Sequence, residues 1–573
     1  MNKLQFLKEI TKSGNQITIS GEAISDQIDV LVNLNSKGLC FKECVFENDV
    51  YFENIDISYG IKFINCTFKK SIAFNNCQAS KFDSKFNFDN YHIYFKSVKI
   101  DGGLYFNGNN KIERGVIISN KSVINKLQVK SLLSDKGGFS VIDSTIEKQF
   151  DINQSRFAID FEISENSIIN SMIRIEKLTS SAIVFSDSNC NNIVHIWSGE
   201  INSLIFNDGY FKQDVNVKAV SIIDTMTIFG TDFKKNVSFK IQDTTNKTSG
   251  KLTKIYIESG KFGEQFIVNG DNTQIDELSI ITSKQLEGDI YFNSCELLKT
   301  KISGNNYRSN IVFNHSNFNR LNFDFFYNYS TLSIISAKSF NENSELSIAH
   351  TNLGKSHLFN TSLNTFEKIN IYHSVLSEII TANVKWFDDK KLNTNTSPCS
   401  HHFSYKKEIY RQLKFALEKQ GDRIASLKFK ALEMSAFKRE SFSKVKWYKR
   451  ILNIDRFILW VGQSNNFGQN WLKPALLSIL LTLVFFCLIV VGLSEKLTYL
   501  FNLNIDSIVF TWNELTRHSY AIPLLLNPVH ELRLIFPEYE NISFYVYLID
   551  YFQKIVIAFF IFQVISAFRK YMK

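Results

Sequence analysis

An eleven-residue spacing of apolar side chains constrains the fold of this chain more than any other feature. One set consists of Phe41, Phe52, Phe63 and Phe74, and parallel sets are Cys44, Ile55, Cys66 and Cys77, and Phe46, Ile57, Phe68 and Ala79. Each eleven-residue unit contains two short stretches in which apolar and polar side chains alternate, as in Ile61-Lys62-Phe63. Alternation with period two is typical of a half-buried strand.

Strands of three residues cannot form a stable sheet alone, but a coiling chain that stacks each strand on its equivalent in the next turn buries a continuous core. The spacing therefore predicts a mainly β fold, a right-handed parallel β-helix (solenoid). Two units would make one coil of about 22 residues. The same register recurs downstream in three sets, which are Phe139, Phe150 and Phe161; Phe206, Val217, Ile228 and Phe239; and Phe211, Ile222 and Phe233.

Proline supports this prediction, because all five prolines of the chain lie after residue 397. A stacked parallel sheet uses nearly every backbone N–H group, and proline has none to donate. The corners between the short strands are rich in Asn, Asp, Ser and Lys, which tolerate tight turns. We expect the solenoid to extend from about residue 30 to about residue 385, with 52 phenylalanines in the chain to supply its core.

The spacing of Cys66 and Cys77 is open to three interpretations: a disulfide, a metal site or a packed wall. Ile55 occupies the same eleven-residue set, which packing allows and a metal site does not. Residues 1–16 have no apolar segment typical of a secretory signal, so we expect reduced thiols that pack as small side chains.

After residue 390 the apolar pattern becomes helical. Residues 405–440 are predicted to form a helical hairpin, with a helix stop and a new N-cap at Gln420-Gly421-Asp422. Residues 441–472 form a basic amphipathic stretch that is typical of a membrane surface. Residues 402–473 contain sixteen Lys and Arg against six Asp and Glu, whereas the whole chain carries +9. The solenoid is therefore nearly neutral, which argues against a DNA mimic and against a protein that grips a long duplex.

Two segments are predicted to span a membrane. Residues 475–493 are nineteen residues without a charge, preceded by Trp471 and Lys473 as interface residues. A second segment, 544–568, ends in the basic interface pair Arg569 and Lys570. Residues 494–543 hold three basic and six acidic residues, so we expect this loop to face outwards and both termini to lie in the cytoplasm of a bacterial cell, with the chain multi-pass in the inner membrane.

These patterns divide the chain into nine regions. They are an N-terminal cap (1–29), the cytoplasmic β-helix (30–385), a linker (386–404), the helical hairpin (405–440), the basic juxtamembrane segment (441–472), a first transmembrane helix (473–494), an external loop (495–543), a second transmembrane helix (544–568) and a cytoplasmic tail (569–573).

Polar residues in the second span are the first candidates for function. Asp550 and Lys554 are spaced to pair on one helix face, and Gln553 lies between them. Ionisable residues at membrane depth usually face a bundle interior or an aqueous path, so these residues could line a pore, or Asp550 could lie at the headgroup level. Gln563, deeper in the span, is placed for an interhelical hydrogen bond or a pore contact.

The loop supplies further candidates. Its apolar run 520–526 contains Pro523 and is flanked by Trp512, Arg517 and His518. This run could be a re-entrant pore and gate segment or an ordinary surface helix, and no potassium-filter sequence is present.

Other chemistry receives little support. Cys399, His401 and His402 lack a fourth ligand at a familiar zinc spacing, so we predict no metal and no cofactor. No nucleotide-binding glycine loop, nucleophile elbow or clustered carboxylate pair is evident, so we predict no enzyme.

The phenylalanine columns resemble degenerate pentapeptide-repeat β-helices, with eleven instead of ten residues per pair of sides. The run "YRQLKFALEKQGDRIASLKFKALEMSAF", followed by "SNNFGQNWLKP" and "FQVISAFRKY", resembles bacterial proteins that join such a solenoid to a two-helix membrane module. The resemblance includes membrane effectors of anti-phage defence, such as the channel-like component of Hailong-type systems. It implies membrane depolarisation and regulation by a short nucleotide or DNA oligomer made by a partner enzyme.

The sequence thus favours a homo-oligomeric membrane effector, expected to be a tetramer, in which the solenoid gates an ion channel or pore. The competing hypothesis is a membrane-anchored scaffold or binding protein without pore activity. Both hypotheses name the lipid bilayer as a partner, and they differ in whether the spans do more than anchor the chain.

Overall fold

The structure is a computed structural model. It describes residues 1–12, 16–30, 38–57, 59–80, 91–240, 252–271, 274–394, 402–443, 459, 462–493 and 505–568. The chain divides into two compact units, residues 1–395 and 396–573.

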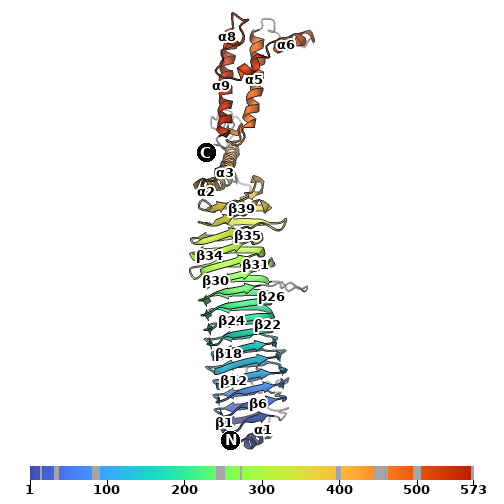
Figure 1. Ribbon diagram of the computed structural model, residues 1–573, viewed down its shortest axis with the longest axis vertical. Helices are drawn as coiled ribbons and strands as arrows, with labels where there is room; N and C mark the ends of the chain where they lie inside the picture. The colour runs from blue at the N-terminus through green and yellow to red at the C-terminus, as the bar shows by residue number, and fades with distance from the viewer. Residues whose placement is uncertain are drawn as a thin grey trace. The chain divides into compact units, whose positions relative to one another are not determined.

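The first unit is a parallel β-solenoid of about 16 turns, which confirms the predicted fold class. Figure 1 shows its strands stacked coil upon coil from β1 (Gln16–Ser20) onward. The last strand is β41 (Leu392–Asn393). Among the described residues, all strands belong to one sheet and each pairs in parallel with strands of neighbouring coils.

The spacing between equivalent positions is 22 residues where the coils are uninterrupted. Leu39 of β4 (Gly38–Lys42) lies opposite Ile61 of β7 (Ile61–Ile64), and Val50 of β6 (Val50–Glu53) lies opposite Ile72 of β9 (Ile72–Asn75). Two eleven-residue units therefore make one coil, as the sequence predicts.

Phenylalanines that are eleven residues apart in the sequence fall into two separate stacks in the structure. Stacked neighbours in each are 22 residues apart where the coils are uninterrupted. Phe41 and Phe63 stack with ring centroids 5.1 Å apart, and Phe52 and Phe74 stack at 4.9 Å. Residues eleven apart face each other across the coil instead, as the T-shaped pair Phe52 and Phe63 shows at 6.5 Å. The core is thus filled by aromatic ladders along the solenoid axis, which offset stacking favours.

The corners need backbone in the left-handed region. Asn54, Asn65 and Asn76 have φ of 50°, 53° and 55°, and Asn, Asp and Ser occupy many of the equivalent corners. Asparagine tolerates this conformation better than other residues with a Cβ atom, because its short side chain can bond to the local backbone. The polar corner composition noted in the sequence therefore has a conformational cause.

The strands begin before residue 30 and continue past residue 385. In β1, Gln16 already lies opposite Gly38, with the same offset of 22. The buried side chains of β1 are isoleucines, so the aromatic ladder that marks later coils in the sequence is missing there. Helix α1 (Lys3–Thr11) covers this end, and the ring of its Phe6 stacks on Phe41 at 5.9 Å. Capping of this kind protects the exposed end of a solenoid.

The cysteines of the solenoid pack as small side chains. Cys66 Sγ lies 3.4 Å from the carbonyl of Phe41, and Cys77 Sγ lies 3.3 Å from the carbonyl of Phe52, so the two thiols belong to different faces. Both are free and buried. Burial raises the pKa of Cys77 to about 12. These thiols are therefore neutral packing groups, as expected.

The second unit is helical. Its helices are α2 (His402–Lys419), α3 (Arg423–Ser443), α5 (Leu472–Leu493), α6 (Ile505–Arg517), α7 (Ala521–Leu525), α8 (Leu532–Ile535) and α9 (Phe544–Phe568). Helices α2 and α3 form the predicted hairpin. Gly421 has φ +79° in the turn, and Asp422 accepts a hydrogen bond from the N–H of Ala425 at 3.0 Å as an N-cap.

The aromatic ladder generates a test of the fold. We expect Phe63→Ala to lower the local stability of the solenoid by about 3–5 kcal/mol, because a fully buried ring is lost between two stacked neighbours. Hydrogen exchange of β4, β7 and β11 (Ile93–Lys96) measures this as faster local opening.

The control is Tyr329→Ala, since this ring is largely exposed. Its removal should change the free energy of opening of the same three strands by no more than about 0.5 kcal/mol. Equal protection of the three strands in the wild type and in Phe63→Ala would show that the ladder is not the source of their stability.

Candidate functional site

Two antiparallel helices dominate the second unit. Helices α5 and α9 run side by side (Figure 1), and both are long and apolar enough to cross a membrane. About half of their apolar side chains are exposed, including Leu476, Ile479, Leu480, Val484 and Leu488 of α5 and Tyr551, Phe552, Ile555, Phe562 and Ile565 of α9. An apolar surface of this extent requires lipid or other protein around it.

Contacts at both ends set the register of the pair. A Cβ atom on Gly492 would lie 2.7 Å from Val546 Cγ2, so the helices approach closely at that end. Trp471 stacks on Phe568 at the other end, with centroids 5.3 Å apart. The stretch from 471 to 492 rises about 32 Å at 1.5 Å per residue, which matches the roughly 30 Å of a bilayer core.

The segment between the helices, residues 505–543, is called the connecting segment below. Its buried residues join those of the helix pair in one apolar cluster, made of Phe486, Ile489, Val490, Leu493, Ala521, Leu525, Leu532, Ile535, Phe536 and Val546. Pro523 lies in the third position of α7 and is exposed, whereas Ala521 and Leu525 on either side are buried. The run 520–526 therefore packs against the helix pair through one face.

A hydrogen bond from Gln553 sets the position of α7 along α9. Its Nε2 donates to the carbonyl of Leu525 at 3.0 Å, and the side chain is fully buried. Gln553 is seven residues beyond Val546, so this contact lies about 10 Å along α9 from the Gly492 end. The end of α7 is therefore level with the interior of the helix pair, and Gln553 satisfies a carbonyl that the short helix leaves free.

Three ionisable side chains meet beside this contact, and we call them the carboxylate cluster. His530 Nε2 lies 2.7 Å from Asp550 Oδ1, and Lys554 Nζ lies 2.7 Å from Asp550 Oδ2. The side chains of His530 and Asp550 are each 5% exposed, and that of Lys554 is 29% exposed. A buried carboxylate needs such partners, because its desolvation costs several kcal/mol.

The structure therefore brings together Asp550, Gln553 and Lys554, and it adds His530 to them. Sequence spacing finds the pair Asp550 and Lys554, but His530 lies twenty residues away on a loop, where no periodicity links it to α9. The nearest signal is its position in the turn-forming run Asn-Pro-Val-His-Glu, which is too general to indicate a partner.

His518 occupies a separate aromatic enclosure in the connecting segment. Its ring lies within 6.2 Å of the rings of Tyr520, Phe536 and Tyr539, and the residue is 1% exposed. Its Nε2 lies 3.4 Å from Tyr539 Oη and 3.9 Å from Glu514. Burial, with a smaller contribution from the charge of Glu514, raises the pKa of Tyr539.

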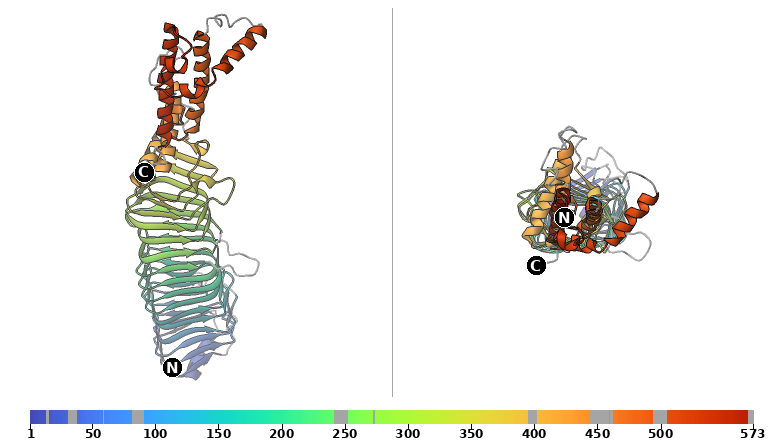
Figure 2. Two further views of the ribbon diagram at one scale, coloured as in Figure 1. Left: turned by 45° about the horizontal axis from the view of Figure 1, so that its top comes forward. Right: turned by 90° about the horizontal axis from the view of Figure 1, so that it is seen from above.

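The remaining loop candidates are at the surface. Arg517 pairs with Glu538 at 2.8 Å, and both side chains are more than half exposed. Trp512 of α6 is 68% exposed, and α6 projects away from the helix pair in Figure 2. The loop candidates Trp512, Arg517, His518 and Pro523 are therefore not gathered into one site.

The other end of the helix pair carries a second polar contact. Asn465 Nδ2 donates to Gln563 Oε1 at 2.5 Å, which joins α9 to the turn before α5. Gln469 Nε2 donates to the carbonyl of Leu427 in α3 at 2.9 Å. The hairpin, the start of α5 and the end of α9 are thus linked by side-chain hydrogen bonds.

Only some of the residues predicted to lie at the membrane interface fall within the described residues. Trp471 and Lys473 are exposed at the start of α5. Arg569 and Lys570 lie outside the described residues, as does most of the basic stretch 441–472. Three residues were considered as metal ligands in the sequence. Of these, His402 begins α2, whereas Cys399 and His401 lie outside the described residues.

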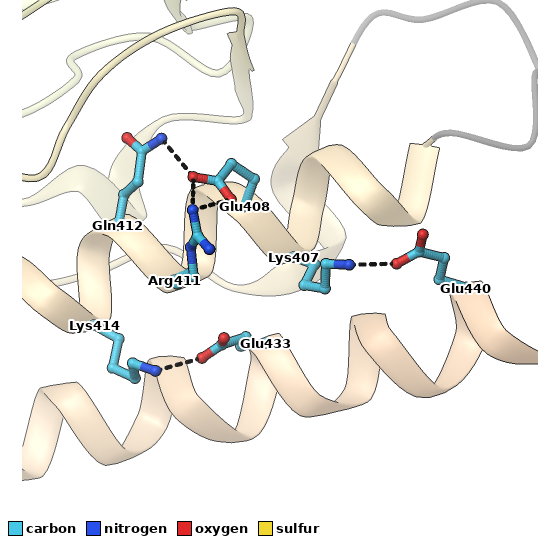
Figure 3. A network of polar contacts seen from close by, with 7 residues as sticks. All are labelled: Lys407, Glu408, Arg411, Gln412, Lys414, Glu433 and Glu440. Atoms are coloured by element: carbon cyan, nitrogen blue, oxygen red, sulfur yellow. Dashed lines mark hydrogen bonds and ion pairs between the residues drawn. The ribbon is translucent and has the colours of Figure 1, made fainter. Parts of the chain in front are cut away.

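The hairpin is held by ion pairs between its helices. Figure 3 shows Lys414 of α2 reaching Glu433 of α3 at 2.9 Å, and Lys407 reaching Glu440 at 2.7 Å. The side chains of Lys414 and Glu433 are 22% and 15% exposed. Partial burial makes such pairs stronger than pairs in open solvent.

Comparison of the chain with protein-family models, with curated proteins and with solved structures finds no match. The resemblance to pentapeptide-repeat and Hailong-type proteins thus has no support from a family match, and the fold and site stand on the geometry of the chain itself.

The ion pairs of the hairpin generate a prediction. We expect a double-mutant cycle of Lys414→Met and Glu433→Gln to give a coupling free energy of about 1 kcal/mol, since both side chains are mostly buried. Hydrogen exchange of α3 measures the free energy of opening in each variant.

The matched control is the pair Glu408 and Arg411, whose side chains are 40% and 62% exposed on one helix. Its coupling should be about 0.3 kcal/mol or less. A coupling no larger for the first pair than for the control would rule out the ion pairs as the link between α2 and α3.

Proposed function

We propose that this protein is an oligomeric membrane effector whose helices α5 and α9 span a bacterial inner membrane and form an ion-conducting pore controlled by the cytoplasmic solenoid. The observation that carries the proposal is the carboxylate cluster. Asp550 is four residues beyond Val546 and therefore about 6 Å along α9 from the end of the helix pair. Ionisable groups at such depth are rare in spans and mark ion pathways by default.

The exposed apolar faces support the oligomer. Two helices cannot enclose a pore alone, so several copies must surround an axis, and closed cyclic symmetry gives a tetramer as one such assembly. Lys554 is the partly exposed member of the carboxylate cluster and is the residue we assign to the conducting path. The charge pattern of the flanks supports an orientation in which the connecting segment faces outwards.

The hydrogen bonds at the other end supply a route from the solenoid to the pore. The hairpin follows the solenoid in the chain, and Leu427 of α3 is bonded to Gln469, three residues before α5. In this proposal a ligand held by the solenoid changes the hairpin and thereby α5 and α9. A short nucleotide or DNA oligomer made by a partner enzyme, and a role in anti-phage defence by depolarisation, come from the sequence resemblance.

The test is ion flux through liposomes that contain the purified full chain, together with membrane potential in bacteria that overproduce it. We expect flux and depolarisation. We also expect Lys554→Met to shift the reversal potential towards cation permeability, because it removes a positive charge from the path. The matched control is Arg517→Met, which removes a positive charge at the surface of the connecting segment.

Two outcomes would count against the proposal at different levels. Liposomes that show no ion flux, together with an unchanged membrane potential in bacteria, would exclude a pore. Flux with an unchanged reversal potential in Lys554→Met would remove this residue from the path and leave the pore in place.

One observation favours the scaffold instead. Asp550 and Gln553 are buried and bonded within a single chain, as expected of groups that hold the connecting segment in place. Replacement of α5 and α9 by unrelated spans separates the two functions, since a scaffold keeps its cellular effect and a pore loses it.

A further inference from the structure

Both ring nitrogens of His530 face acceptor oxygens, so the ring needs one more proton than its neutral form carries. Its Nδ1 lies 2.6 Å from the carbonyl oxygen of Asn527, and its Nε2 lies 2.7 Å from Asp550 Oδ1. A carbonyl oxygen only accepts, so Nδ1 must carry a hydrogen. The carboxylate oxygen also accepts, and a neutral ring carries only one hydrogen, so one ring nitrogen would present its lone pair to an acceptor oxygen and the two would repel each other.

A proton between Nε2 and Oδ1 removes this conflict. It can reside on the ring, which gives an imidazolium beside a carboxylate, or on the carboxyl, which gives a neutral acid beside a neutral ring. Both forms contain the same atoms and the same total charge. The two short contacts together therefore require one proton more than a neutral ring and a carboxylate hold, and charge-assisted bonds of this length are strong in a buried setting.

The other charged groups around the pair do not supply this proton. Lys554 of α9 donates to the second oxygen, Oδ2, at 2.7 Å. From α8, Arg533 donates to Tyr547 Oη at 3.1 Å and so faces α9 one turn away. From α7 the nearest group is the backbone carbonyl of Leu525, which Gln553 occupies. The residues of α5 in the same apolar cluster are uncharged.

We propose that His530 and Asp550 form a proton-binding site, and that the bound proton holds residues 527–530 of the connecting segment against α9. When the pH rises, the ring loses one of its two N–H protons to solvent water and becomes neutral. Asp550 stays a carboxylate paired with Lys554. A ring lone pair then faces either Oδ1 of Asp550 or the carbonyl oxygen of Asn527, and the loss of one of these two contacts loosens this part of the connecting segment.

The site is thus a pH-sensitive contact between the connecting segment and α9, on one side of the helix pair. Its action needs only the connecting segment and α9, so it stands whether or not the protein conducts ions. The bond from Gln553 to Leu525 lies outside the titrating pair, so α7 itself should stay in place while the loop after it moves.

A spin label at residue 529 reports this movement, because Val529 is 83% exposed and adjacent to His530. The label is attached to V529C in the full chain in lipid nanodiscs, with Cys487 and Cys399 replaced by serine. Electron paramagnetic resonance is recorded from about pH 5 to about pH 9, the range in which an imidazole exchanges its proton. We expect at least a twofold rise in the mobile fraction of the label as the pH rises.

Two variants separate proton binding from a merely structural contact. H530Q supplies an N–H donor to Asp550 that does not titrate, and D550N supplies an N–H donor to the neutral ring. Both should keep the label immobile across the pH range. The control E531Q changes an exposed carboxylate next to the site and should keep the transition.

A mobile fraction that is independent of pH in the parent chain overturns the proposal. So does a transition that persists in H530Q, since it would then arise from another group. Nitrogen NMR of labelled histidine in the same sample gives a second readout. The signal lost in H530Q must belong to a doubly protonated ring at low pH that loses one proton in step with the label.

Discussion

Each strand of the solenoid depends on its neighbours one coil away for its backbone hydrogen bonds. β7 has four residues and β8 (Thr67–Phe68) has two, which is too few for a strand that stands alone. Their N–H and C=O groups bond to the coil before at an offset of 22 residues and to the coil after at an offset of 32 residues. This ladder explains why proline is absent before residue 398 and why the chain turns through left-handed corners, since the ladder must resume in register after every bend.

The same dependence decides what the sequence can and cannot reveal. The aromatic spacing predicts the coil, because a side chain that points inwards must recur once per side. It does not show how the rings of the two sides meet, which the structure gives as the T-shaped pair of Phe52 and Phe63. The first coil is also hidden, because isoleucine in β1 packs where phenylalanine stands later and leaves no distinct signal.

The candidate site illustrates a different limit. Asp550 and Lys554 are one helical turn apart, so their pairing follows from α-helical geometry alone. His530 reaches Asp550 only because α7 packs into the apolar cluster and the chain turns back after Leu525. That return depends on tertiary packing of residues with no common period. Sequence reasoning therefore finds the groups on one element and misses the partner that a loop delivers.

Helix α9 connects the two polar contacts of the helix pair. Asp550 and Gln563 are thirteen residues apart, or about 20 Å along one continuous helix. A shift of α9 by a single residue moves both side chains by about 1.5 Å. Such a shift would change both the 2.5 Å bond to Asn465 and the 2.7 Å contact with His530. The contact near the hairpin and the contact with the connecting segment therefore lie on one continuous helix, and any movement of α9 along its axis affects both of them.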